Sequence, residues 1–233
     1  MKGFALAAAA ALAPMTAAAF ECHTALVLGL DASRSVDKRE SQLQREGLAA
    51  ALTAPEIVSA IMPYEGIGIA AMAFEWSNPT AELVIAPWRV LNSEAAIKSF
   101  AAEIVAGPEI SQRWKTGIGS AMRFAARAFD AAPVACRRRV IDVSGDGPGN
   151  AGAPPEQYRR QGVFDGLIIN GLVIRHPDND AAQPPNRDPA IYYRRHVAQG
   201  PGAFIMETKS YDDYPEAIRR KLLRELSPPL AAK

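Results

Sequence analysis

The chain has 233 residues, of which 48% are hydrophobic and 22% are charged, and its formal net charge is +1. This length and composition are typical of one globular domain with a sizeable core. The near-zero net charge excludes a general electrostatic attraction to nucleic acid or to an anionic membrane surface.

The first 19 residues are predicted to be a secretory signal peptide. Lys2 gives a positive start, residues 5–13 form a short apolar core, and residues 17–19 offer the small side chains of a cleavage site. The alternative is an N-terminal membrane anchor, but the segment is short and rich in alanine for a membrane span. We therefore expect a periplasmic or secreted protein with no membrane span in the mature chain.

Beyond residue 19 the hydrophobic pattern alternates between strand and helix. Apolar runs of strand length predict strands at 24–30, 66–74, 82–88, 138–144, 166–174 and 203–208. Helical spacing, with Ser93 as an N-cap, predicts helices at 36–53, 93–105, 116–131, 155–164, 190–199 and 212–226. This order predicts an α/β domain over 20–227 with a short tail at 228–233. Its expected core is a doubly wound, mainly parallel, six-stranded sheet with helices on both faces, as in Rossmann-like folds.

Oxygen-bearing side chains gather at three boundaries of these elements. Asp31, Ser33 and Ser35 follow the first strand, Thr116 opens a helix, and Asp146 follows the fourth strand. In such sheets ligands bind outside the carboxyl ends of the strands, where the strand order reverses. Two carboxylates and three hydroxyls suit a hard cation such as Mg²⁺. Each hydroxyl taken alone fits a helix cap or a turn equally well.

Two cysteines occupy equivalent positions before two of the predicted strands. Cys22 lies three residues before Ala25, and Cys136 lies three residues before Arg139. If those strands are parallel neighbours, both cysteines lie at the amino-terminal edge of the sheet. Export permits a disulfide, so we expect a Cys22–Cys136 bridge, and two buried free thiols are the alternative.

The pieces around the proposed cation resemble a known family. Asp31-x-Ser33-x-Ser35, Thr116 and Asp146-Gly147 match the metal-ion-dependent adhesion site (MIDAS) of von Willebrand factor type A (VWA) domains, in the right order and context. The resemblance spans about residues 24–227. More narrowly, the chain is similar to an uncharacterised group of secreted bacterial members, through the stretches 140–147, 200–204 and 217–225.

The resemblance implies a role for each site residue. Ser33, Ser35 and Thr116 would ligate the ion directly, and Asp31 and Asp146 directly or through water. Mg²⁺ keeps an exchangeable position, which an exposed Asp or Glu of a protein partner would fill. Mn²⁺ and Ca²⁺ are alternatives to Mg²⁺.

Other residues are candidates for supporting roles. Asp142 and Ser144 lie on the strand before Asp146 and are candidates for a second shell. A buried Asp142 would instead serve as a structural hydrogen-bonding group. Arg34, Arg175 and His176 are candidates for a rim that contacts the partner, although Arg34 also fits a plain solvent-exposed role.

These observations predict a secreted domain that binds a protein partner through a divalent metal, without catalysis. One rival is a hydrolase or phosphotransferase that uses the same ion as a Lewis acid. The sequence places no neighbouring His, Lys or Cys as a base or nucleophile for it. A second rival is an envelope component whose metal only stabilises the fold.

Overall fold

The structure is a computed structural model that describes residues 20–111, 114–175 and 188–227. Its centre is a six-stranded sheet with the order β3-β2-β1-β4-β5-β6. All neighbouring strands run parallel except the antiparallel pair β2–β3. The strands are β1 (Glu21–Asp31), β2 (Ile67–Trp76), β3 (Glu82–Leu91), β4 (Cys136–Gly145), β5 (Ile168–Ile174) and β6 (Ile205–Thr208). The mainly parallel α/β sheet expected from the sequence is thus confirmed.

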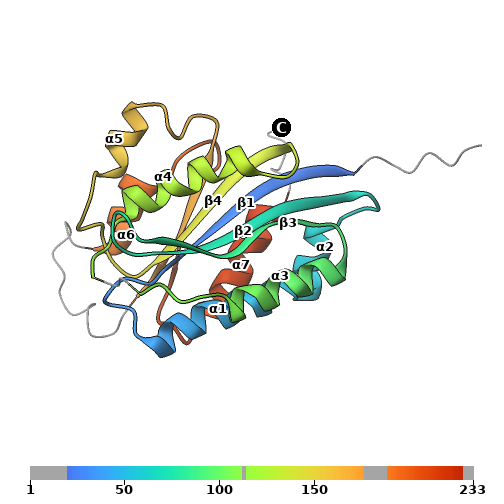
Figure 1. The fold of residues 1–233 in the computed structure, drawn as a ribbon, viewed down its shortest axis with the longest axis horizontal. Coiled ribbons are helices and arrows are strands. Elements are labelled where there is room, and N and C mark those ends of the chain that lie inside the picture. Colours follow the sequence, from blue (N-terminus) through green and yellow to red (C-terminus); the bar gives the residue numbers. More distant parts are fainter. Residues whose placement is uncertain (1–19, 112–113, 176–187, 228–233) are drawn as a thin grey trace, which may run out of the picture.

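Helices cover both faces of the sheet (Figure 1). One face carries α1 (Lys38–Leu52), α2 (Pro55–Ile61), α3 (Glu94–Ala106) and α7 (Tyr214–Leu226). The other face carries α4 (Ile118–Ala128), α5 (Pro155–Arg160), α6 (Pro189–Tyr192), a 3₁₀ turn (Phe129–Ala131) and a π turn (Tyr193–Val197). Two apolar cores result, one on each side of the sheet.

The central strand β1 shows why this chain forms three layers. Leu26 and Leu28 pack into the core beneath α1 and α7, whereas Ala25 and Val27 pack into the core beneath α4. Successive side chains of a strand point to opposite faces. An almost continuous apolar run therefore has both faces buried, as in parallel sheets generally.

Three elements differ from the sequence-based expectation. The helix expected over 190–199 is divided into α6 and the π turn that follows it. Helix α2 was not predicted, because it has seven residues and begins with Pro55 directly after the first helix ends. So short a segment carries little helical periodicity, although Pro at the first helical position is a start signal. The helix expected over 155–164 ends at Arg160, since Gly162 adopts a left-handed backbone conformation with φ of 72°.

The first helix begins with a capping box that fixes the chain after β1. Asp37 accepts a hydrogen bond from the Glu40 N–H at 2.8 Å, and Glu40 accepts one from the Asp37 N–H at 2.9 Å. Reciprocal bonds of this kind satisfy two backbone donors at a helix start. The segment that carries Ser33 and Ser35 is therefore held between the end of β1 and a well-defined helix start.

The residues outside the described ranges include several of those singled out in the sequence. The signal peptide over 1–19, the tail over 228–233 and His176 all lie there. Within the described ranges, no helix has the length and apolar character needed to cross a membrane.

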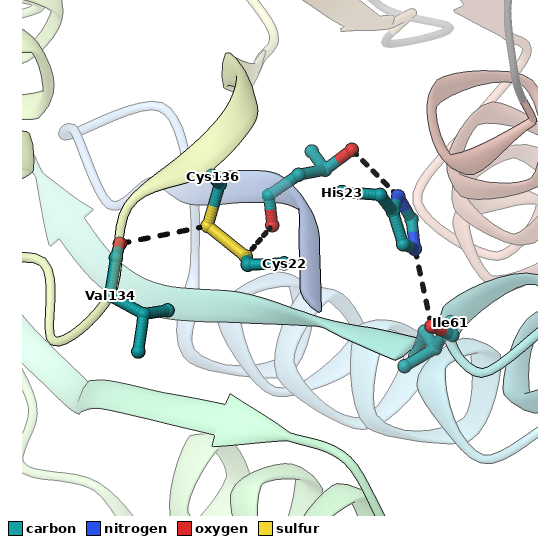
Figure 2. Close-up of a disulfide and its surroundings, with 6 residues drawn as sticks. Cys22, His23, Ile61, Val134 and Cys136 are labelled. Atoms are coloured by element: carbon teal, nitrogen blue, oxygen red, sulfur yellow. Dashed lines mark hydrogen bonds between the residues drawn. A yellow bond between two sulfur atoms is a disulfide. The ribbon is translucent and has the colours of Figure 1, made fainter. Parts of the chain in front are cut away.

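The predicted disulfide is present at the amino-terminal edge of the sheet. Cys22 and Cys136 are direct partners in the parallel register of β1 and β4, with α-carbons 4.6 Å apart. Figure 2 shows the bridge beside His23, which lies between Thr24 and the Ile61 carbonyl oxygen. The bridge joins strands that lie 114 residues apart in the sequence.

We expect the double variant Cys22→Ser, Cys136→Ser to keep the fold and lose stability. Loss of a cross-link over a loop of this size costs up to about 4–5 kcal/mol in the chain-entropy model. Urea unfolding of the variant measures the loss, and the reduced wild-type protein is the control that should match it. An unchanged free energy of unfolding would contradict a stabilising role.

A second stabilising feature is a buried cluster of charges between the sheet and α7. Lys221 is fully buried, and its Nζ lies 2.6 Å from Asp142 Oδ2 and 2.7 Å from Glu225 Oε1. Asn170 donates to the same Glu225 oxygen at 2.8 Å. Burial, followed by the charge of Asp142, raises the pKa of Glu225 to about 7. One ammonium group thus holds two carboxylates together.

We predict that Lys221→Met destabilises the protein strongly near neutral pH. Removal of the ammonium group leaves Asp142 and Glu225 buried together, and breaking such a network costs about 3–5 kcal/mol. The loss should shrink at acidic pH, where Glu225 takes up a proton. Urea unfolding at both pH values measures it, with Lys98→Met at an exposed ion pair as the control. Equal effects of the two substitutions would contradict the role assigned to Lys221.

Candidate metal centre

Three segments that are distant in the sequence meet at the carboxyl edge of the sheet. Asp31 is the last residue of β1, and Asp146 directly follows the last residue of β4. These two strands are neighbours. Successive strands extend from them in opposite directions, to β2 on one side and to β5 on the other. The site therefore lies where the strand order reverses, as ligand sites of open α/β sheets do.

Four of the five predicted ligands form one chain of hydrogen bonds. Asp31 Oδ1 accepts the Ser33 N–H at 2.7 Å, and the hydroxyls of Ser33 and Ser35 lie 3.2 Å apart. Ser35 in turn donates to Asp146 Oδ1 at 2.8 Å. Asp31, Ser33 and Asp146 are buried, whereas Ser35 is exposed. The series of hydrogen bonds therefore begins and ends at a buried carboxylate and reaches the surface at Ser35.

Thr116 joins this site through Asn150, a residue that the sequence did not single out. The Thr116 N–H donates to Asn150 Oδ1 at 3.0 Å, and the Asn150 N–H donates to the Thr116 carbonyl at 2.9 Å. The Asn150 amide also reaches the Thr116 hydroxyl at 3.4 Å. Asn150 thereby ties the segment before α4 to the loop that follows Asp146.

The two buried carboxylates of the site, Asp31 and Asp146, are unfavourable to ionise together. Burial, followed by the charge of Asp146, raises the pKa of Asp31 well above its ordinary value. Asp31 has no cationic side chain as a partner among the described residues, and its Oδ2 atom accepts no hydrogen bond there. A bound cation would offset both the burial and the repulsion. This buried oxygen without a hydrogen-bond partner is the observation which indicates that the residues present fit a metal ion.

The donor set narrows the kind of ion. No group of three or more His, Cys, Asp or Glu that could hold a metal occurs in the described part of the chain. Hydroxyl oxygens would therefore have to complete the ligand set of Asp31 and Asp146. Oxygen-only ligation with few carboxylates suits a small hard cation.

Aromatic side chains enclose the buried end of the site. A Cβ atom added to Gly145 would lie 2.5 Å from the Tyr193 hydroxyl, 2.8 Å from Asp31 Oδ2 and 3.2 Å from the Trp76 ring. Tyr193 and Trp76 are buried, and the Tyr193 hydroxyl and Trp76 Nε1 have no hydrogen-bond partner among the described residues. Burial, together with the charges of Asp31 and Asp146, raises the pKa of Tyr193 and keeps its hydroxyl protonated.

A second tyrosine faces the other carboxylate. Tyr211 precedes α7 and is buried, and its hydroxyl lies within reach of Asp146. Burial, and then the charges of Asp146 and Asp31, raise the pKa of Tyr211 well above its ordinary value. The sequence did not identify either tyrosine as part of the site. The pattern that predicts a helix over 190–199 does not tell which distant residues Tyr193 contacts, and Tyr211 lies before α7 in a loop with no periodic pattern.

The candidates for a second shell have other partners. Asp142 pairs with Lys221 of α7, and the Ser144 hydroxyl lies 3.5 Å from the Tyr214 hydroxyl, also on α7. Asp142 lies four residues before Asp146, which is about 13 Å along an extended strand. Both residues therefore have partners on α7, which accords with the structural role of Asp142, and their second-shell role stays a prediction.

The three residues predicted to form the partner-contacting rim lie in different surroundings. Arg34 is exposed on the segment between Ser33 and Ser35, where a partner can reach it. Arg175 instead binds Asp188 at 2.9 Å and Glu207 at 2.7 Å. Asp188 is the N-cap of α6. Arg175 therefore fixes the start of α6, and His176 lies outside the described residues.

With the site described, the chain can be placed among known proteins. Residues 21–230 match a family described as "Protein of unknown function (DUF1194)". The chain belongs to the DUF1194 family. A search of the curated proteins finds no match.

Solved structures show which fold this DUF1194 member has. It is similar to a von Willebrand factor type A protein from Catenulispora acidiphila, with 14% identity and a TM-score of 0.59 over 88% of this chain and 43% of that one. It is also similar to proximal thread matrix protein 1 of the mussel byssus "with zinc occupied MIDAS motif", with 14% identity and a TM-score of 0.59 over 89% and 48%.

BatB from Bacteroides thetaiotaomicron matches at 16% identity, with a TM-score of 0.54 over 87% of this chain and 98% of that one. The chain spans less than half the length of the Catenulispora and mussel proteins. At these identities the comparisons show a shared VWA fold, which confirms the resemblance stated from the motifs.

We predict that Gly145→Ala damages the centre and Gly147→Ala does not. The added methyl group at position 145 meets the Tyr193 hydroxyl and Asp31 Oδ2, whereas position 147 has no atom within 4 Å. Overpacking of this kind costs about 1–3 kcal/mol. Urea unfolding of both variants measures the difference. Equal stability of the two would show that the space above Gly145 is not confined.

Proposed function

We propose that this protein is a divalent-metal-dependent binding domain that captures an acidic side chain of a protein partner. The observation that carries the proposal is the buried pair Asp31 and Asp146, linked through Ser33 to the exposed hydroxyl of Ser35. A bound cation would offset the burial and mutual repulsion of the pair, and Ser35, which lies between Ser33 and Asp146 in the series, is exposed to solvent.

Asp31, Ser33, Ser35, Thr116 and Asp146 are the proposed ligands, and Mg²⁺ is the proposed ion, with Mn²⁺ or Ca²⁺ as alternatives. When bound, the ion would supply an electrophilic contact for an incoming carboxylate. Three of the five ligands are neutral hydroxyls, so little excess negative charge opposes that carboxylate. The zinc-occupied MIDAS of the mussel protein supports a divalent ion in this fold.

Binding is favoured over catalysis by the chemistry of the assembled groups. The carboxylates and hydroxyls are metal ligands, the Asn150 amide links two loops, and Tyr193 and Tyr211 are held in the protonated form. None of these supplies a nucleophile with a lowered pKa. The mussel relative is named as a matrix protein, which accords with binding.

Export to the periplasm or beyond the cell is part of the proposal. The Cys22–Cys136 bridge accords with an oxidising compartment, because stable disulfides are rare where thiols are kept reduced. The predicted signal peptide over residues 1–19 agrees with this location.

We predict opposite effects of Asp31→Asn on the metal-free and the metal-bound protein. The folded state raises the pKa of Asp31 above its usual 3.8, so ionising this group costs stability. The cost is absent at low pH and grows as the pH rises above the usual value towards the raised one. The variant should therefore be more stable than the metal-free wild type near neutral pH.

The same substitution should abolish stabilisation by Mg²⁺. A ligand that binds only the folded state stabilises it by RT ln(1 + [L]/Kd). In the wild type this gain should increase with pH, because the ion displaces the proton of Asp31. Calorimetry and thermal melting with Mg²⁺, Mn²⁺ or EDTA measure both effects, with Asp212→Asn at an exposed ion pair as the control. Absence of metal binding by the wild type at every pH would remove the basis of the proposal.

A further inference from the structure

One exposed aromatic residue lies two positions before the proposed ligand Thr116 in the sequence. The Trp114 side chain is 68% exposed, although tryptophan is highly buried on average. By contrast, Trp76 is buried, and Trp88 donates from Nε1 to the Ala128 carbonyl at 2.9 Å. Trp114 precedes Thr116 by two residues, which places their α-carbons within about 7 Å of each other.

The backbone at Trp114 is held by hydrogen bonds to the turn that follows β2. The N–H groups of Trp114 and Lys115 both donate to Asn78 Oδ1, at 3.1 and 2.9 Å. The Ser77 hydroxyl donates to the Lys115 carbonyl at 3.2 Å, and the Ser77 carbonyl accepts a hydrogen bond from the Gly117 N–H at 2.7 Å. These bonds hold the backbone of residues 114–117, whereas the indole is left to solvent.

The first part of the same loop is packed against the Asp31–Ser35 segment. Ile110 is buried in a small apolar cluster with Ala32 and Ala81. Its N–H donates to Glu75 Oε2 at 3.1 Å. Arg45 pairs with the same carboxylate and also donates to the carbonyls of residues 107 and 108, both at 2.7 Å. The loop that presents Trp114 is thus anchored to the segment that supplies three of the proposed ligands.

We propose that Trp114 is an apolar contact for the partner of the metal site, so that the partner segment carries an aromatic or aliphatic residue beside its acidic one. This inference rests on the proposed function. A carboxylate alone gives a metal site little selectivity, since every soluble protein exposes Asp and Glu. Tryptophan is enriched among the residues that dominate binding energy, and a fixed backbone lowers the entropy cost of binding.

The short separation in sequence also bears on the partner. Trp114 and the proposed ligand Thr116 are two residues apart, so their α-carbons lie within about 7 Å of each other. We therefore expect the acidic residue and the apolar residue of the partner to come from one short segment.

A random-peptide display selection tests this inference, performed with the wild-type protein in Mg²⁺ and in EDTA. The wild type should enrich peptides that bind only in Mg²⁺ and share an acidic residue with an apolar neighbour. The Trp114→Ala substitution should lower the affinity of the protein for the selected peptides by roughly tenfold or more. It should keep the stabilisation by Mg²⁺, because Trp114 is not a ligand. Bound peptide should also protect the indole from iodide quenching.

Tyr64→Ala is the matched control. Tyr64 is 75% exposed and lies just before β2. The first residue of β2 pairs with Glu21 at the amino end of β1, so Tyr64 lies at the edge of the sheet opposite to the proposed metal site. Its removal should leave peptide affinity unchanged.

The outcomes separate the inference from the function on which it rests. Magnesium-dependent acidic peptides that lack a recurring apolar neighbour, or that bind Trp114→Ala as well as the wild type, would overturn the role of Trp114 and leave the metal site standing. A selection that yields no magnesium-dependent peptide would overturn both.

Discussion

The structure depends above all on the parallel register of β1 beside β4. This pairing places Cys22 opposite Cys136 at one end of the sheet and brings the segments after Asp31 and Gly145 together at the other. Because parallel strands end at the same edge, one register fixes both the cross-link and the candidate site. A slip by one residue would exchange the two faces of β1 and expose its leucines to the wrong core. The disulfide therefore stabilises the alignment that the site requires.

Much of this arrangement follows from the sequence because its signals are local. Apolar runs identify the strands, and the proposed oxygen ligands come at or soon after strand ends or before a helix, so the topology brings their segments to one edge of the sheet. Asn150, Tyr193 and Tyr211 escape such reasoning, since each reaches the site from an irregular loop or turn. Their contacts depend on packing between segments that no period relates. Helix α2 was missed for a related reason, because seven residues are too few to show a period.

Asp142 shows that a correct local interpretation can leave the partner of a buried side chain open. Its position in a buried strand demands a partner, and proximity in sequence to Asp146 suggests one. The partner is in fact Lys221, which the last helix of the domain brings to the strand. Only the docking of α7 decides this, and the helical pattern around residue 221 does not reveal that a lysine lies at its most buried point. Long-range packing, not local chemistry, sets the role of this carboxylate.

Two buried pairs of carboxylates among the described residues differ in how their charge is compensated. Asp142 and Glu225 receive the ammonium group of Lys221, so the chain itself supplies the compensating charge. Asp31 accepts a hydrogen bond from a backbone N–H and lies beside neutral aromatic side chains. Within the described ranges no lysine or arginine pairs with it. An internal cation suits a site whose task is to hold a helix, because it never needs to leave. A site that must open to solvent and exchange a ligand is better served by a cation taken from solution. The contrast between the two pairs supports the proposal that the carboxyl edge of the sheet takes up a metal ion, whereas the charges at the interface with α7 are compensated within the chain.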